Sequence, residues 1–166
     1  MNYSGTLKVT TRGDREIIMT RSFNAPRALV FDAFTKPELV RQWLLGPDGW
    51  TMPVCEIDLR VGGSYRYVWR NASGMQMGMG GVYREIVVPE KIVSTERFDE
   101  SWYPGEAVGT LVLSEQGGKT TVTQTVLYDT TQARDAVLKS PMESGVEAGY
   151  QRLEKLLATF DGAKSA

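Results

Sequence analysis

Three aromatic residues at every second position, Tyr65, Tyr67 and Trp69, carry the most distinctive chemistry in this sequence. Alternation with a period of two is typical of a β-strand whose alternate side chains share one face. Such a face can bind an apolar or aromatic molecule, while the Tyr hydroxyls and the Trp N–H remain able to form hydrogen bonds. The same rings could instead belong to an ordinary core, which is the usual place for an aromatic stripe on a strand.

Three methionines, Met75, Met77 and Met79, continue this alternation a few residues later. Methionine adapts to irregular apolar shapes, and it is common at sites that accept several ligands. Filling gaps in the core, or lying on a loop, is the alternative role for these side chains.

Acid–base chemistry in this chain would have to use carboxylates, Lys, Arg or Tyr, because the sequence contains no histidine. The Ser-His and Cys-His systems and the preferred zinc ligand are therefore excluded. Glu56 and Glu96 are the candidates for a carboxylate that faces the interior, and Glu96, between Ser94 and Phe98 on one strand face, is the candidate for catalysis. If that face is the inner one, burial will raise the pKa of Glu96 and make it an acid, a base or a hydrogen-bond anchor. In the opposite register it is a surface residue.

Asp58 and Arg60 lie on the same side of their strand, beside the Gly62-Gly63 turn. We expect an ion pair that fixes the strand end, in preference to a substrate-binding pair. No metal site and no cofactor are expected.

Length and charge limit the class of protein. The chain has 166 residues, enough for one domain, with 19 Lys and Arg against 20 Asp and Glu. The basic residues are scattered, which excludes a nucleic-acid binder, and no apolar run approaches the ~20 residues of a membrane span. The first twenty residues lack the apolar core of a signal peptide. Together with the single cysteine, Cys55, these features predict a cytoplasmic protein.

The expected elements follow from periodicity and turn residues. A strand is predicted over residues 16–23, then a short helix after Pro26 and a second one after a capping box at residues 35–38. Residues 50–128 read as a meander of strands, with Gly117-Gly118 as a hairpin turn. Residues 141–160 predict a long amphipathic helix that contains Gly145 and Gly149. This order indicates an α+β domain over residues 15–161, after an N-terminal extension (1–14) that could join the first strand and before a C-terminal tail (162–166).

Several sequence blocks, at residues 23–27, 34–39, 56–63 and 81–86, together resemble a known family. They are similar to the family named after the C-terminal domain of the activator of the Hsp90 ATPase, which belongs to the START-like helix-grip superfamily. The likeness runs from about Arg15 to Leu157, and the Asp58-x-Arg60-x-Gly62-Gly63 block is its most specific part. The resemblance implies a curved antiparallel sheet around the long C-terminal helix, with a cavity between them that holds a hydrophobic small molecule in many members.

A hydrophobic or aromatic small molecule in that cavity is therefore the expected ligand. The residues expected to contact it are Trp43, Tyr65, Tyr67, Trp69, Met77, Phe98, Met142, Val146 and Tyr150. Trp102 and Tyr103, in the loop over residues 99–106, are expected to form a gate. Two alternatives stay open: an enzyme that uses the cavity for acid–base chemistry through Glu96 or a tyrosine, and a co-chaperone-like interaction module. Eukaryotic co-chaperones of this kind carry a separate N-terminal domain for which this length leaves no room, so direct Hsp90 activation is not the expected role.

Overall fold

The computed structural model describes residues 7–99 and 105–165, with side chains to residue 160. Its strands form one antiparallel sheet in the order β1-β2-β8-β7-β6-β5-β4-β3. The strands are β1 (Lys8–Arg12), β2 (Glu16–Phe23), β3 (Trp50–Ile57), β4 (Ser64–Asn71), β5 (Gln76–Val87), β6 (Lys91–Phe98), β7 (Ala107–Gln116) and β8 (Lys119–Leu127). The helices are α1 (Arg27–Thr35), α2 (Pro37–Trp43), α3 (Thr131–Lys139) and α4 (Met142–Ser165).

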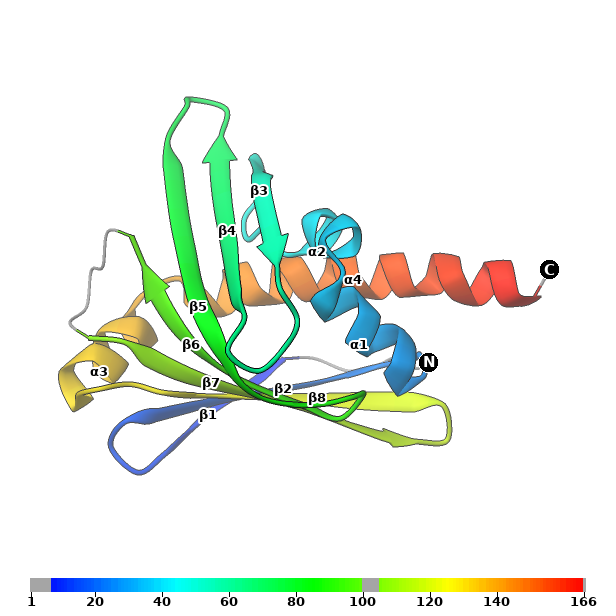
Figure 1. The fold of residues 1–166 in the computed structure, drawn as a ribbon, viewed down its shortest axis with the longest axis horizontal. Coiled ribbons are helices and arrows are strands. Elements are labelled where there is room, and N and C mark those ends of the chain that lie inside the picture. The colour runs from blue at the N-terminus through cyan, green and yellow to red at the C-terminus, as the bar shows by residue number, and fades with distance from the viewer. Residues whose placement is uncertain (1–6, 100–104, 166) are drawn as a thin grey trace.

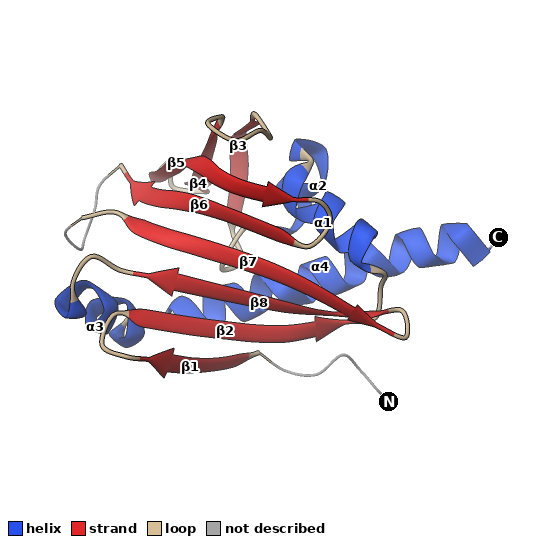
Figure 2. Ribbon diagram, turned by 60° about the horizontal axis from the view of Figure 1, so that its bottom comes forward, coloured by secondary structure: helices blue, strands red, loops and turns tan. Residues whose placement is uncertain are grey.

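The sheet curves around α4, as the sequence predicted for a helix-grip fold. Figure 1 shows β3, β4 and β5 standing away from the other strands, and Figure 2 shows α4 behind the broad part of the sheet. Three side chains of α4, Tyr150, Leu153 and Leu157, are buried against the sheet at the spacing of one helix face. The α+β helix-grip prediction is confirmed.

The N-terminal region forms a strand of its own. Residues of β1 pair with β2 from Lys8↔Thr20 to Arg12↔Glu16, so the two strands make a hairpin at the sheet edge. An ion pair of 2.8 Å joins Arg12 and Glu16 across this hairpin. The sequence left residues 1–14 as an extension because β1 has no buried face, and its burial pattern is almost entirely exposed.

The capping box predicted at residues 35–38 is wrong. Thr35 is the last residue of α1, and its hydroxyl donates to the Phe31 carbonyl at 2.8 Å, so it caps nothing in α2. The N-cap of α2 is Lys36, followed by Pro37 at the first helical position. Proline suits that position because its missing N–H would have no helical partner there.

The apolar interior consists of two clusters. The first core cluster lies around α1, α2 and α4 from Tyr150 onward, and includes Phe23, Trp43 and Leu157. The second core cluster lies around α3, and includes Ile17 and Val126. Val146 of α4 packs against both clusters, so it lies over the boundary between them. None of the described helices is long and apolar enough to span a membrane.

Candidate functional site

The aromatic ladder of β4 faces inward, toward the helix side of the sheet. Ring centroids of Tyr65 and Tyr67 are 5.1 Å apart, and those of Tyr67 and Trp69 are 5.8 Å apart. The Trp69 Nε1–H donates to the Leu44 carbonyl at 2.7 Å. The ladder therefore has the single-faced geometry that its spacing predicted, and its outer ring is held by the loop after α2.

Trp43 and Tyr150 close the same end of the interior. Trp43 Nε1 donates to the Ala33 carbonyl at 2.9 Å, and its ring lies 5.9 Å from that of Tyr150. Gly149 brings the two helices together, because a Cβ on it would lie 3.1 Å from the Trp43 carbonyl oxygen. This glycine therefore admits the backbone of α2, and the aromatic end of the predicted site is packed as core.

The other predicted contacts occupy different places. Phe98, Met142 and Val146 are partly buried and pack against the second core cluster. Met77 is 45% exposed, on the β4–β5 hairpin, away from the space beneath α4. Trp102 and Tyr103 lie outside the described residues.

A row of polar residues and one glycine separates the two clusters on the inner face of the sheet. Each of four neighbouring strands contributes to this row, which we call the polar row. Its members are Arg21 of β2, Gln124 of β8, Gly109 of β7, and Ser94 and Glu96 of β6. The strand register places them inward, since Ile92 pairs with Leu111, and Leu111 with Gln124, in the first core cluster. Apolar residues flank the row on both sides along every one of these strands.

Arg21 is the one member of the polar row with charged partners. Its guanidinium donates to Glu147 at 3.2 Å and to Glu154 at 2.9 Å, both on α4. The same guanidinium lies 4.7 Å from the centre of the Phe23 ring. This end of the row is therefore closed by bonds between sheet and helix.

Glu96 and Gln124 have no such partners. In the described part of the chain, neither side chain makes a hydrogen bond, and the Tyr67 hydroxyl makes none either. The only fully enclosed polar side-chain atom left without a partner among those residues is Arg27 Nε, so the polar atoms of these three side chains are not fully enclosed. Tyr67 is buried, whereas Glu96 and Gln124 are half-buried. Buried polar groups are usually hydrogen-bonded, so three neighbouring side chains without partners are unusual.

Burial dominates the electrostatics at this point. Desolvation alone raises the pKa of Glu96 to about 7. The pKa of Tyr67 is raised as well, mainly by burial and to a smaller extent by neighbouring groups that include Glu96. The Glu96 carboxyl is thus on the inner face, the alternative under which we expected a raised pKa, and near neutral pH it exchanges between its acid and its ionised form.

Gly109 makes room for both polar groups. A Cβ on this residue would lie 2.5 Å from Glu96 Oε2 and 2.9 Å from Gln124 Nε2. The Glu96 and Gln124 side chains therefore occupy the space that a side chain on Gly109 would fill. Gln124 and Gly109 were not predicted as site residues, although a Gln at the inward position between Val122 and Val126 is a polar interruption of an apolar strand face.

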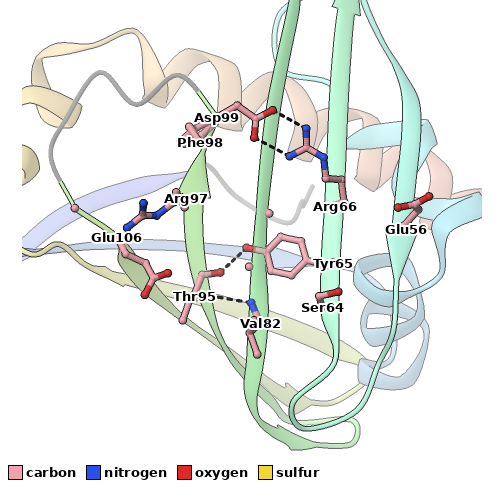
Figure 3. Close-up of a pocket in the computed structure, with 13 residues that line it drawn as sticks. Glu56, Ser64, Tyr65, Arg66, Val82, Thr95, Arg97, Phe98, Asp99 and Glu106 are labelled. Atoms are coloured by element: carbon pink, nitrogen blue, oxygen red, sulfur yellow. Dashed lines mark hydrogen bonds and ion pairs between the residues drawn. The ribbon is translucent and has the colours of Figure 1, made fainter.

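A separate groove lies on the outer face, where β4, β5 and β6 bend (Figure 3). Its volume is about 1030 Å³, and Arg66 and Asp99 bridge its rim with two bonds of 2.7 and 2.5 Å. The groove is lined by Glu56, Ser64, Tyr65, Arg66, Gly80, Gly81, Val82, Thr95, Arg97, Phe98, Asp99, Gly105 and Glu106.

Tyr65 separates this groove from the interior. Its hydroxyl donates to the Thr95 carbonyl at 2.6 Å, and the Thr95 hydroxyl accepts from the Val82 N–H at 2.9 Å (Figure 3). These side-chain bonds stand where regular ladder pairs between β5 and β6 are interrupted, since pairing skips from Gly80↔Arg97 to Tyr83↔Ser94. Glu96 lies within this interrupted stretch.

Two other features lie away from the polar row. Asp58 and Arg60 form the expected ion pair at 2.9 Å, beside the turn. Cys55 is buried, and desolvation raises its pKa to about 11. No group of three potential metal-ligating side chains occurs among the residues that the structure describes.

Comparisons with known proteins identify relatives of this chain both by sequence and by fold. The model of the Activator of Hsp90 ATPase homolog 1-like protein family matches residues 24–158. The chain belongs to this family. A comparison with curated proteins gives no match.

Solved structures of other proteins share the fold over nearly the whole chain. A Rhodobacter sphaeroides protein is 30% identical with a TM-score of 0.88, and the match covers 93% of this chain and 99% of that one. A Staphylococcus epidermidis protein is 31% identical with a TM-score of 0.78, covering 92% and 94%. A Plasmodium falciparum protein described as an HSP90 activator is 23% identical with a TM-score of 0.52, covering 69% of this chain and 73% of that one, and it shares the fold alone.

Proposed function

We propose that this member of the Activator of Hsp90 ATPase homolog 1-like family binds a hydrophobic or aromatic small molecule between the sheet and α4. The observation that carries the proposal is the polar row, where Glu96 and Gln124 lie without hydrogen-bond partners among the described residues, between two apolar clusters. Ligand sites are commonly apolar cavities with a few convergent polar groups. The ligand would contact Tyr67, Phe98 and Val146 at this boundary, and the packed ring pair of Trp43 and Tyr150 would form the closed end.

Two-dimensional NMR of the labelled protein tests the site directly. Titration with small aromatic molecules is expected to shift amide signals along β6, β7 and β8 and in the first turns of α4. Shifts confined to the outer face, or none at all with any ligand, would refute the proposal.

A pair of matched variants localises the effect. Val146→Phe adds volume over the polar row and is expected to weaken binding. Val112→Phe makes the same change at an exposed position of β7, and it is expected to leave binding unchanged. Equal effects of both variants would place the ligand elsewhere.

The pKa of Glu96 supports a second candidate, an enzyme that performs acid–base chemistry on the bound molecule. A group with a pKa of about 7 can act as general acid or base near neutral pH. Turnover with a bell-shaped pH profile that disappears in Glu96→Gln is the expected signature, and turnover unaffected by that change would remove Glu96 from the mechanism.

The family name and the described activity of the Plasmodium falciparum relative favour a third candidate, interaction with an Hsp90 chaperone. Stimulation of the ATPase activity of purified Hsp90 by this protein is the measurement that supports it. An ATPase rate unchanged by saturating protein would rule out direct activation.

A further inference from the structure

Two hydrogen-bonding groups in the polar row are positioned to act on one ligand atom or group. A Cβ atom on Gly109 would lie 2.5 Å from Glu96 Oε2 and 2.9 Å from Gln124 Nε2, so both atoms lie close to the same position. The distance between these two atoms therefore cannot exceed the sum of those values. A carboxyl and a primary amide this close present adjacent donor and acceptor atoms over a floor without a side chain.

The surroundings of Glu96 contain no charge that compensates an ionised carboxylate. The titratable groups packed across this face include Cys55 of β3, Tyr65, Tyr67 and Tyr83 of β4 and β5, Arg21 of β2, Tyr128 after β8, and Glu147, Tyr150 and Glu154 of α4. The Arg21 guanidinium is already bonded to Glu147 and Glu154. None of these groups contributes to the pKa shift of Glu96, whose one cause is desolvation.

The charge state of Glu96 decides which ligand group it can hold. An ionised carboxylate without a counter-charge costs far more free energy in an apolar site than the neutral acid does. The neutral acid has an O–H that needs an acceptor, and the Gln124 amide offers further N–H donors. The ligand group that completes both is a neutral oxygen acceptor, such as a ketone or another carbonyl.

We propose that the polar row recognises the carbonyl oxygen of an uncharged, largely apolar ligand, with protonated Glu96 donating one hydrogen bond and the Gln124 amide a second. This inference rests on the proposed function, because it names the chemistry of the ligand at the same site. It makes binding depend on protonation: ligand affinity is constant while Glu96 is protonated, and it falls as Glu96 ionises.

Two isosteric probes separate carbonyl recognition from apolar binding. Acetophenone carries a carbonyl oxygen, and α-methylstyrene replaces that oxygen with a methylene group; the naphthyl homologues of both give a larger ring. The dissociation constants of each pair are measured by NMR titration between about pH 6 and about pH 8. The ketones are expected to bind about tenfold more weakly at the upper pH, as one ionising group with a pKa near 7 requires, whereas the hydrocarbons keep a constant affinity.

The Glu96→Gln variant tests whether Glu96 is the titrating group. Its amide retains a donor and cannot ionise, so ketone binding is expected to persist without pH dependence. Glu56→Gln, the same change at an exposed position of β3, is the matched control and keeps the wild-type profile. Gln124→Leu is expected to weaken the ketones relative to the hydrocarbons while the pH midpoint stays in place.

The outcomes distinguish the two proposals. If neither ketones nor hydrocarbons bind, the proposed function fails and this inference fails with it. If both bind with equal affinity and the same pH profile, the site is apolar only and carbonyl recognition is refuted. Ketone affinity that rises with pH, or a pH dependence that survives in Glu96→Gln, would also overturn the inference, and preferential binding of a protonated amine such as 1-phenylethylamine at the higher pH would identify a cationic ligand instead.

Discussion

Replacing Glu96 by Gln is expected to stabilise the protein at neutral and alkaline pH. Glutamine has nearly the same shape but cannot ionise, so the variant lacks the cost of a desolvated carboxylate. Because the pKa of Glu96 is about 7 in the folded protein and 4.5 in its ordinary state, the folded chain retains a proton that the unfolded chain releases between these values.

The sign and size of the effect follow from proton linkage. The free energy of unfolding of the wild type falls as pH rises from 4.5 to about 7, because the unfolded state binds fewer protons there. It is unaffected by Glu96 below that window and constant above it. At about 1.4 kcal/mol for each pH unit, the full difference amounts to about 3 kcal/mol.

Urea unfolding of both proteins at several pH values between about 5 and 8 measures the contribution of Glu96 to the free energy of unfolding. Other carboxylates titrate in both proteins, so the difference between variant and wild type isolates Glu96. The midpoint of Glu96→Gln relative to wild type is expected to rise by about 1 M urea across the range, at an unchanged slope. Glu56→Gln provides the surface control. A difference that stays flat with pH would mean that the Glu96 carboxyl is solvated in the folded protein, which would contradict its desolvation in the polar row.

Three further changes test the surrounding structure. Tyr65→Phe removes the donor to the Thr95 carbonyl, and urea unfolding is expected to show a loss of about 1–3 kcal/mol; no loss would mean that another donor replaces the hydroxyl. Gly149→Val brings side-chain atoms against the Trp43 carbonyl and is expected to cost about 1–3 kcal/mol, whereas Gly145→Val, where the nearest atom to a Cβ is Pro47 Cδ at 3.8 Å, serves as the milder comparison. Burial and a pKa of about 11 leave about one part in a thousand of Cys55 ionised at about pH 8, so iodoacetamide is expected to label it slowly until urea unfolds the chain, and rapid labelling of the native protein would contradict its burial.

The fold could be predicted because several local signals agreed with one another. The alternation of Tyr65, Tyr67 and Trp69 gave the facing of β4, and the apolar spacing of residues 141–160 gave the buried face of α4. The Gly117-Gly118 turn has positive φ values of 61° and 77°, which suit the two-residue hairpin that the sequence predicted. A fold can be predicted from sequence when the local propensity, the apolar pattern and the turn residues all indicate the same structure.

The site was harder to predict because aromatic residues serve core and ligand equally well. Nothing in the sequence distinguishes Trp43, whose N–H is bonded to the Ala33 carbonyl, from Tyr67, whose hydroxyl has no partner among the described residues. The polar row is also formed by four strands that are far apart in sequence. Single residues such as Gly109 and Gln124 acquire meaning only when the register brings them beside Glu96.

The polar row lowers the stability that this interior would otherwise have. Apolar residues at the positions of Glu96 and Gln124, with a side chain at Gly109, would join the two core clusters into one and bury more apolar surface. The protein instead keeps an ionisable group whose burial opposes folding above the window in which it titrates. Departures from local consistency of this kind concentrate at functional sites, since binding requires groups that the protein leaves without partners of its own. The proposed recognition of a ligand accounts for a row that packing alone disfavours. In Glu96→Gln, the gain in stability is therefore expected to come together with ketone binding that persists but no longer depends on pH.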